Sequence, residues 1–171
     1  MTQVLISLVN IARLRRDPSV LPASIALLFL MSVAYAAGSA LQSWLLYGSD
    51  RLLARTAADL GLTFAIFWFV LAVTRRLHRY RQTMNAVLGT SVLLTPVLML
   101  LIALQQPAAV YYPVKLVAWA GSIAVIVWYT LIIGHILRSA IEIGFVTSIA
   151  IAITTVIAAN AVLGKLFPMA A

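Results

Sequence analysis

The chain alternates between long apolar runs and short polar segments. Five runs are long enough to cross a bilayer: residues 23–46, 57–74, 84–104, 114–136 and 143–164, with 24, 18, 21, 23 and 22 residues. A helix rises about 1.5 Å per residue, so runs of these lengths match a hydrocarbon layer about 30 Å thick. In lipid the backbone has to satisfy its own hydrogen bonds, which favours helices. The pattern predicts an all-α fold: a bundle of five transmembrane helices in one domain that covers residues 1–171.

The first 16 residues show polar and apolar positions at helical spacing. The polar side chains recur every three or four residues, at Gln3, Ser7, Asn10 and Arg13. The apolar side chains occupy the opposite side, at Val4, Leu5, Leu8, Ile11 and Ala12. This pattern predicts a short amphipathic helix on the membrane surface. Asp17 ends it, because a residue before proline is pushed out of the helical region. We expect residues 1–22 to form a cytoplasmic amphipathic segment.

Composition supports a membrane protein and excludes several other classes. The 171 residues are 64% hydrophobic and 9% charged, with a mean hydropathy of +1.07 and no cysteine. An ordinary soluble domain is about half apolar and about a quarter charged. The composition therefore argues against a soluble enzyme, a disordered chain and a disulfide scaffold. The five runs sum to 108 residues and leave 63, which is too few for a separate soluble catalytic domain.

The distribution of positive charge predicts the orientation in the membrane. Lys and Arg concentrate on the cytoplasmic side of membrane proteins. With the N-terminus inside, eight fall inside and four outside. The inside set is Arg13, Arg15, Arg16, Arg75, Arg76, Arg79, Arg81 and Arg138, and the outside set is Arg51, Arg55, Lys115 and Lys165. We therefore expect a cytoplasmic N-terminus and an external C-terminus. The excess of Arg (10) over Lys (2) favours a GC-rich bacterial genome and hence the bacterial inner membrane.

The segment 75–81 carries the densest positive charge, with Arg75, Arg76, Arg79 and Arg81. One interpretation is an anchor that fixes the topology. The other is a contact with anionic lipid head groups or an acidic protein, to which each basic residue could contribute about 1 kcal/mol. Nucleic acid is not expected as a partner, because seven residues offer no fold module to position them.

Asp59 is the only acidic residue well inside an apolar run. Carboxylates inside a membrane are costly and are functional candidates. Asp59 lies about one turn from the predicted outer boundary, and Arg55 four residues earlier can pair with it on the same helical face. Two interpretations follow: a local ion pair, or a polar relay for protons or cations.

The last two runs are joined by residues 137–142, which predict a tight helical hairpin. His135, Arg138 and Glu142 follow one another at spacings of three and four, so they form a candidate staple with an Arg138–Glu142 ion pair. A metal shared by His78, His135 and Glu142 is the alternative, but two separated histidines without a ligand-type spacing are a weak metal signal.

Further polar residues within the runs suggest a transport role. Ser39, Gln42 and Thr63 join Asp59, and Thr95-Pro96 interrupts the third run. By contrast, the sequence contains no HExxH, no phosphate-binding P-loop and no GxGxxG after a strand. These motifs mark metalloproteases, nucleotide-binding and dinucleotide-binding enzymes. We expect neither catalytic residues nor a cofactor.

Residues 80–89 (YRQTMNAVLG) and 134–141 (GHILRSAI), together with the five runs and the short basic N-terminus, resemble bacterial members of the Yip family of five-span membrane proteins. The Asp-Leu-Tyr-Gly-Pro stretch of the eukaryotic members does not occur. The resemblance implies a non-enzymatic integral membrane protein that organises or assists a membrane assembly. Its expected partners are the bilayer, anionic head groups and other membrane proteins or further copies of the chain. The alternative hypothesis is a small solute or ion transporter, or a channel subunit.

Overall fold

The computed structural model describes residues 2–49, 51–105 and 111–168. These contain six α-helices and two short 3₁₀ turns, and no strand. The helices are α1 (Thr2–Ala12), α2 (Ile25–Tyr47), α3 (Leu52–Val73), α4 (Tyr80–Gln105), α5 (Tyr112–Ile141) and α6 (Phe145–Leu166), with turns η1 (Pro18–Val20) and η2 (Leu77–Arg79). Within the described residues, five helices are long and apolar enough to cross a membrane. The predicted all-α fold with five spans and a short N-terminal helix is confirmed.

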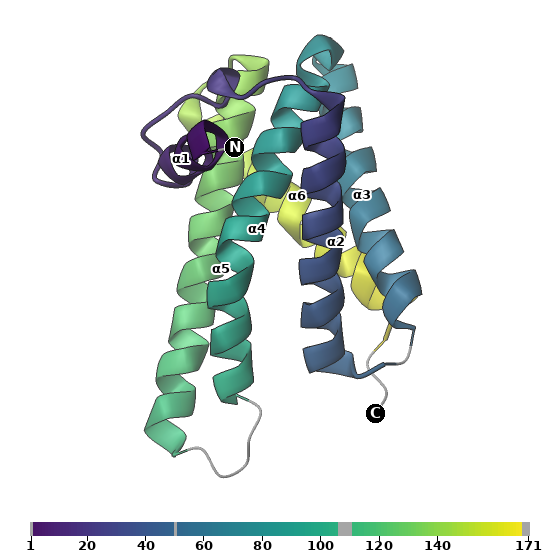
Figure 1. Cartoon of the computed structure of the whole chain (residues 1–171), viewed down its shortest axis with the longest axis vertical. Helices are drawn as coiled ribbons and strands as arrows, with labels where there is room; N and C mark the ends of the chain where they lie inside the picture. Colours follow the sequence, from purple (N-terminus) through teal and green to yellow (C-terminus); the bar gives the residue numbers. More distant parts are fainter. Residues whose placement is uncertain (1, 50, 106–110, 169–171) are drawn as a thin grey trace.

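The long helices enclose a common interior. Contacts run from α3 to α2, from α2 to α4, from α4 to α5, from α5 to α6, and from α6 back to α3. Figure 1 shows α4 and α5 on one side, α2 and α3 on the other, and α6 crossing diagonally behind them. Each of the five long helices therefore contacts at least two of the others, and α3 and α4 also contact each other.

The two largest differences from the predicted helix boundaries are of five residues each. The second span begins at Leu52 instead of residue 57, so Asp59 lies two turns inside α3. The fourth span continues to Ile141 instead of ending at residue 136, because Leu137, Ala140 and Ile141 are buried and extend its apolar face. The predicted hairpin of residues 137–142 therefore shrinks to a turn at 142–144. Its first residue, Glu142, has a left-handed backbone with φ 56°.

The densest packing lies in the half of α4 nearest its N-terminus. Residues 83–91 are all buried, where α1, α2 and α5 cover α4. Outside the ring the side chains are apolar and exposed, as at Phe29 (72%), Phe69 (63%) and Ile157 (62%). Such surfaces are compatible with lipid as the surrounding solvent and incompatible with water over five helices.

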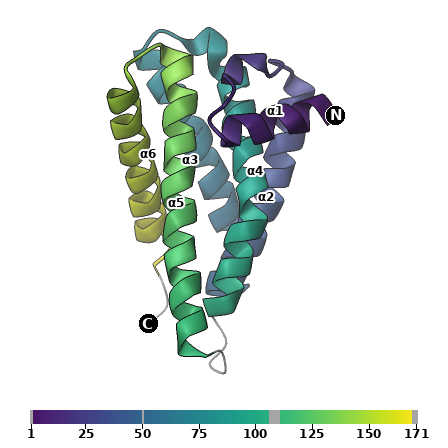
Figure 2. The same cartoon turned by 90° about the vertical axis from the view of Figure 1, so that its left-hand side faces the viewer.

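The N-terminal helix α1 contacts α4 and α5 and runs across the bundle instead of along it (Figure 2). Leu8 packs over Gly89 so closely that a Cβ on this glycine would lie 2.6 Å from the Leu8 Cδ2 atom. The prediction that Ser7 belongs to an exposed polar face is wrong. Ser7 is buried with Leu8 and Ile11 against the bundle, while apolar Leu5 is 53% exposed.

Candidate functional site: a polar cavity between the five long helices

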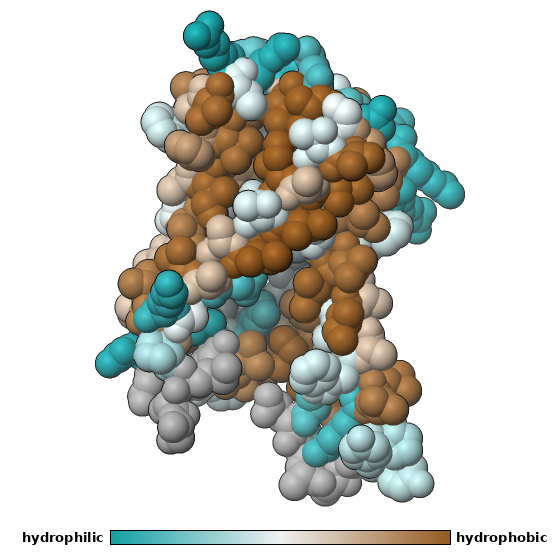
Figure 3. Space-filling view, turned by 180° about the vertical axis from the view of Figure 1, so that it is seen from behind, coloured by the Kyte–Doolittle hydropathy of each residue, from teal (hydrophilic) through white to brown (hydrophobic). Residues whose placement is uncertain are grey.

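A cavity of about 280 Å³ lies between the long helices, and all five contribute to its wall. Its lining is mixed, with polar side chains among aliphatic and aromatic ones. Seen from behind, the molecular surface is hollowed beneath the diagonal ridge of α6, and hydrophilic side chains lie in the hollow (Figure 3). The polar lining residues are Tyr35 and Gln42 of α2, Asp59 and Thr63 of α3, Ser91 and Thr95 of α4, Tyr129 of α5, and Thr155 and Asn160 of α6.

Asp59 is held in this wall by hydroxyl groups from the neighbouring helix. The Tyr35 hydroxyl donates to Asp59 Oδ2 at 2.9 Å, and the Ser39 hydroxyl donates to the same oxygen at 2.6 Å. Tyr35 is the eleventh of the 23 residues of α2, so the carboxylate lies level with the middle of that helix. The structure therefore places Asp59 deeper than the single turn that the sequence predicted.

A second pair of hydroxyl groups lines the cavity from α4 and α5. The Ser91 hydroxyl donates to the Val87 carbonyl at 2.7 Å, and its oxygen lies 2.8 Å from the Tyr129 hydroxyl, which donates to it. Tyr129 is near the middle of α5. Two tyrosine hydroxyls therefore reach the interior from non-adjacent helices, and both are already bonded to a serine or a carboxylate.

The remaining polar groups differ in how they are satisfied. Thr63, Thr95 and Asn160 donate to carbonyls one turn earlier in their own helices, at 2.8 Å each. The side chains of Gln42 and Thr155 have no hydrogen bond with any described residue. In a membrane interior such side chains need a partner. The cavity therefore offers unused hydrogen-bonding capacity to a bound solute.

Charge in the cavity wall is of one sign. Among the described residues that line it, Asp59 is the only acidic or basic one, since no Glu, Lys, Arg or His is present. The rest of the wall includes Phe67 and a set of aliphatic side chains: Ile66, Leu94, Leu98, Val125, Ile126, Ile133 and Val156. A largely apolar wall with a few polar groups is typical of small-molecule sites.

The candidate staple at the α5–α6 turn has different partners from those expected. Glu142 pairs with Arg76 at 2.6 Å and with Arg79 at 2.7 Å, both from the 75–81 segment. Arg79 also donates to the Ser139 carbonyl at 2.8 Å. The expected Arg138–Glu142 pair is absent from these described residues, because the left-handed backbone at Glu142 ends the helical spacing. Arg138 instead lies over the Phe145 ring, 5.9 Å from its centre.

His135 belongs to a different contact, which holds the N-terminal segment. Its Nε2 donates to the Arg16 carbonyl at 3.0 Å, and the indole of Trp128 donates to the Ala12 carbonyl at 3.1 Å. One turn after His135, the Ser139 hydroxyl donates to Asp17 at 2.6 Å. These three α5 side chains share one helix face, and together they hold residues 12–17 against α5.

Helix α4 forms hydrogen bonds with the same N-terminal segment, at residues 19–22. The Gln82 amide donates to the carbonyls of Ser19 and Leu21 at 2.6 and 2.7 Å. The Asn85 amide donates to the Pro22 carbonyl at 2.9 Å. The spacing of three residues places both amides on one face of α4. Polar side chains of two helices therefore satisfy the backbone of a segment that has little regular structure.

Asp17 also caps η1, accepting a bond from the Ser19 amide at 2.7 Å. Burial by itself would raise the pKa of the Asp17 carboxyl. Hydrogen bonds from Ser139 and Ser19, together with the charge of His135, outweigh burial and hold this pKa below its ordinary value. The ionised carboxylate is therefore the form that the folded N-terminal segment favours.

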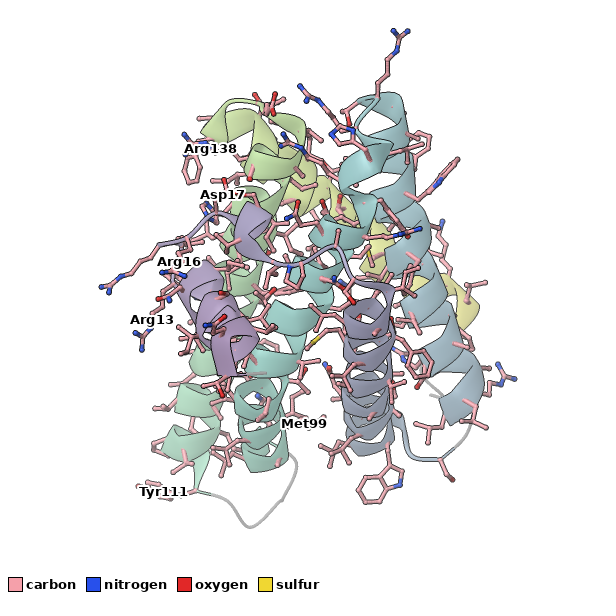
Figure 4. The ribbon with its side chains drawn as sticks, turned by 45° about the horizontal axis from the view of Figure 1, so that its top comes forward. Arg13, Arg16, Asp17, Met99, Tyr111 and Arg138 are labelled. Atoms are coloured by element: carbon pink, nitrogen blue, oxygen red, sulfur yellow. The ribbon has the colours of Figure 1, made fainter. Side chains whose placement is uncertain are left out.

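Most of the exposed arginines lie at the end of the molecule that carries α1 and the 75–81 segment, whereas Arg51 lies at the opposite end. Arg75 and Arg81 are exposed and have no ion pair with a described residue. Figure 4 shows Arg13, Arg16 and Arg138 along one flank, beside Asp17. No group of three metal-ligating side chains comes together in the part of the chain that the structure describes, and His135 and Glu142 already have the partners given above.

No family model, curated protein or solved structure matches this chain.

Proposed function

We propose that this multi-pass protein binds a small solute in its central cavity and passes it across the membrane. The observation that carries the proposal is the cavity of about 280 Å³ to which all five long helices contribute polar side chains. In a bundle that serves only as a membrane anchor, polar groups in the interior would cost free energy without contributing to function. Each isolated charged residue at the centre of a membrane helix costs about 2.5–3.5 kcal/mol on insertion scales. A solute that uses these groups explains why they are there.

The shape of the bundle supports passage as well as binding. The wall contains polar side chains at different levels: Gln42 lies about two turns nearer the C-terminal end of α2 than Tyr35, whose hydroxyl donates to Asp59. Such a series of polar groups provides successive partners for a moving solute. The proposal concerns binding and passage and assigns no catalysis to the cavity.

Thiol labelling tests this proposal cleanly, because the chain contains no cysteine. Thr155→Cys places a thiol in the cavity wall, and Ile157→Cys places one on the exposed outer surface of the same helix. In proteoliposomes, a charged, membrane-impermeant methanethiosulfonate reagent should modify Thr155→Cys at least tenfold faster than Ile157→Cys. Equal rates would show that the cavity is closed to water and would contradict the proposal. Modification from both sides of the membrane indicates passage, whereas modification from one side indicates binding without passage.

The orientation is part of the same proposal. We propose a bacterial inner membrane with the N-terminus in the cytoplasm, on the basis of the charge distribution. Ser19 and Ser49 are exposed at opposite ends of the bundle. In right-side-out vesicles, Ser49→Cys should react with the impermeant reagent and Ser19→Cys only after permeabilisation. The reverse pattern would invert the topology.

A second candidate function is the organisation of a membrane assembly through lipid or protein contacts, as the resemblance to the Yip family implies. The exposed arginines at one end favour it, because Arg75 and Arg81 have no ion pair with a described residue. Anionic head groups would supply the missing negative charge. This candidate is compatible with the first, since it uses the surface and not the interior.

A further inference from the structure

We infer that the solute of the central cavity is a small organic cation, an amine with an apolar body, and that Asp59 is its counter-ion. The inference rests on the proposed function and specifies its substrate class. It follows from three properties of the cavity: the sign of its charge, its size, and the mixture of aromatic and aliphatic side chains in its wall.

The sign of the charge comes from Asp59. It is the only acidic or basic side chain among the described residues of the wall. Arg55 lies one turn nearer the start of α3 and is not one of the lining residues. Asp59 is partly buried in the wall, where charges interact more strongly than in bulk water, so its carboxylate attracts a cation and repels an anion.

The carboxylate is arranged to accept a further donor. The bonds from Tyr35 and Ser39 both go to Oδ2, so Oδ1 receives neither of them. A carboxylate oxygen can accept more than one hydrogen bond. An ammonium group that donates to this carboxylate would form a charge-assisted bond, which is roughly twice as strong as a neutral one.

The size of the cavity argues for an organic cation over a bare ion. A volume of about 280 Å³ equals that of roughly nine water molecules, at about 30 Å³ each in the liquid. A dehydrated monovalent ion would leave most of this space empty. Ca²⁺ and Mg²⁺ need six or more oxygen ligands, with carboxylates among them, and Zn²⁺ is usually held by four ligands such as histidine and carboxylate. The described residues bring no three acidic or histidine side chains together.

The rest of the wall suits an amine with an apolar body. The rings of Tyr35, Phe67 and Tyr129 line the cavity, and aromatic faces attract ammonium groups within about 6 Å. The aliphatic side chains, such as Leu94 and Ile126, provide an apolar surface for the body of the molecule. The unused amide of Gln42 provides a polar contact away from the carboxylate.

Three probes of nearly equal size separate the role of charge from that of shape. The full-length protein, in nanodiscs of neutral phosphatidylcholine, is titrated calorimetrically with phenethylammonium, phenethyl alcohol and phenylacetate. We expect phenethylammonium to bind at least tenfold more tightly than the alcohol, and phenylacetate to bind most weakly. This comparison needs no variant, so it does not depend on the folding of a mutant.

Variants then assign the preference to Asp59. Asp59→Asn should lower the affinity for phenethylammonium to that for the alcohol, while the affinity for the alcohol stays unchanged. Asp59→Glu should keep the preference for the cation. The matched control Asp17→Asn removes an acid outside the cavity and should change neither affinity.

The outcomes distinguish this inference from the proposed function. Equal binding of the ammonium and the alcohol by the unmodified protein would overturn cation selection but leave the cavity as a solute site. If Asp17→Asn loses as much affinity for phenethylammonium as Asp59→Asn does, the assignment of Asp59 as the counter-ion is overturned. If none of the three probes binds, the inference fails, and the thiol labelling of Thr155→Cys decides separately on the proposed function.

Discussion

Two aspartates of this chain have different surroundings, and these determine what each can do. Asp59 lies within a span and accepts bonds from two hydroxyl groups of a neighbouring helix. Asp17 lies at the end of the molecule, where it caps a short turn and accepts a bond from Ser139 of α5. The first carboxylate faces a cavity and can bind a solute. The second ties the N-terminal segment to the bundle.

The attachment through Asp17 should depend on pH. The pKa of this carboxyl is lowered below its ordinary value in the folded state, so folding favours the ionised form. Its contribution is therefore fully present above the ordinary value, near pH 4, and is lost as the pH falls through the lowered value. We expect hydrogen exchange in residues 13–24, corrected for the intrinsic effect of pH, to be less protected at pH 3 than at pH 6.

The Asp17→Asn variant serves as the control for this pH dependence. It should show reduced protection at pH 6 and little further loss at pH 3. If the unmodified protein and Asp17→Asn lose protection in parallel, another group controls the attachment and the assignment to Asp17 is wrong.

Among single residues, Asp59 could be identified from the sequence, but the tyrosines that lie near it in the cavity could not. Asp59 stands out because a carboxylate in an apolar run is rare. Tyr35 and Tyr129 do not stand out, because aromatic residues in such runs commonly mark membrane interfaces or simple packing. Their hydroxyls reach the cavity through contacts between residues 24 and 38 positions apart in sequence. Such contacts leave no local pattern.

Among the secondary-structure elements, the helices could be predicted but their ends could not. Hydrophobicity marks the part of a helix that lies in lipid, whereas the backbone continues to be helical into the head-group region. Helix α5 has 30 residues and extends about 45 Å, which is longer than the hydrocarbon layer of about 30 Å. For the same reason α3 begins at Leu52, before its apolar run.

The contact between α5 and α6 depends on a glycine. A Cβ on Gly134 would lie 3.0 Å from Ile149 Cγ1 and 3.3 Å from the Ile149 Cα atom, which belongs to the backbone. A larger side chain would therefore push the two helices apart. We expect Gly134→Leu to lower the free energy of unfolding by about 1–3 kcal/mol, the usual cost of overpacking. Thermal unfolding in detergent, followed by circular dichroism, measures the change.

Gly61 provides the matched control for this substitution. No atom lies within 4 Å of a Cβ placed there, and the residue is exposed on α3. Gly61→Leu should leave stability unchanged or raise it, because leucine favours the helix by up to about 1 kcal/mol over glycine. If the two variants have the same stability, close packing at Gly134 does not hold α5 against α6.

For the molecule as a whole, the sequence predicted five spans but not the order of the helices around the interior. That order places α6 beside α3, although these helices are far apart in the chain. The cavity is a product of this arrangement, since its wall needs side chains from all five long helices. The number of apolar runs therefore predicts the architecture. It does not predict the site, which depends on how the helices pack.

The uneven distribution of charge over the whole molecule leads to the last prediction. Arg75 and Arg81 are exposed without an ion pair to a described residue, whereas Arg76 and Arg79 are used by Glu142. The double variant Arg75→Gln/Arg81→Gln should therefore weaken binding of phosphatidylglycerol without disturbing the α5–α6 turn. At about 1 kcal/mol per residue, the loss is about 2 kcal/mol, or roughly thirtyfold in affinity.

Binding of fluorescent phosphatidylglycerol and phosphatidylcholine to the detergent-purified protein measures this loss. The control Lys115→Gln/Lys165→Gln removes the same charge from the opposite end and should retain most of the affinity. High salt should weaken binding of phosphatidylglycerol in the unmodified protein, because exposed charges are screened within about 3 Å at 1 M. Equal affinity for the two lipids, or an equal loss in both double variants, would mean that the arginines fix only the topology. The assembly role would then lose its main support, and the cavity would remain the centre of function.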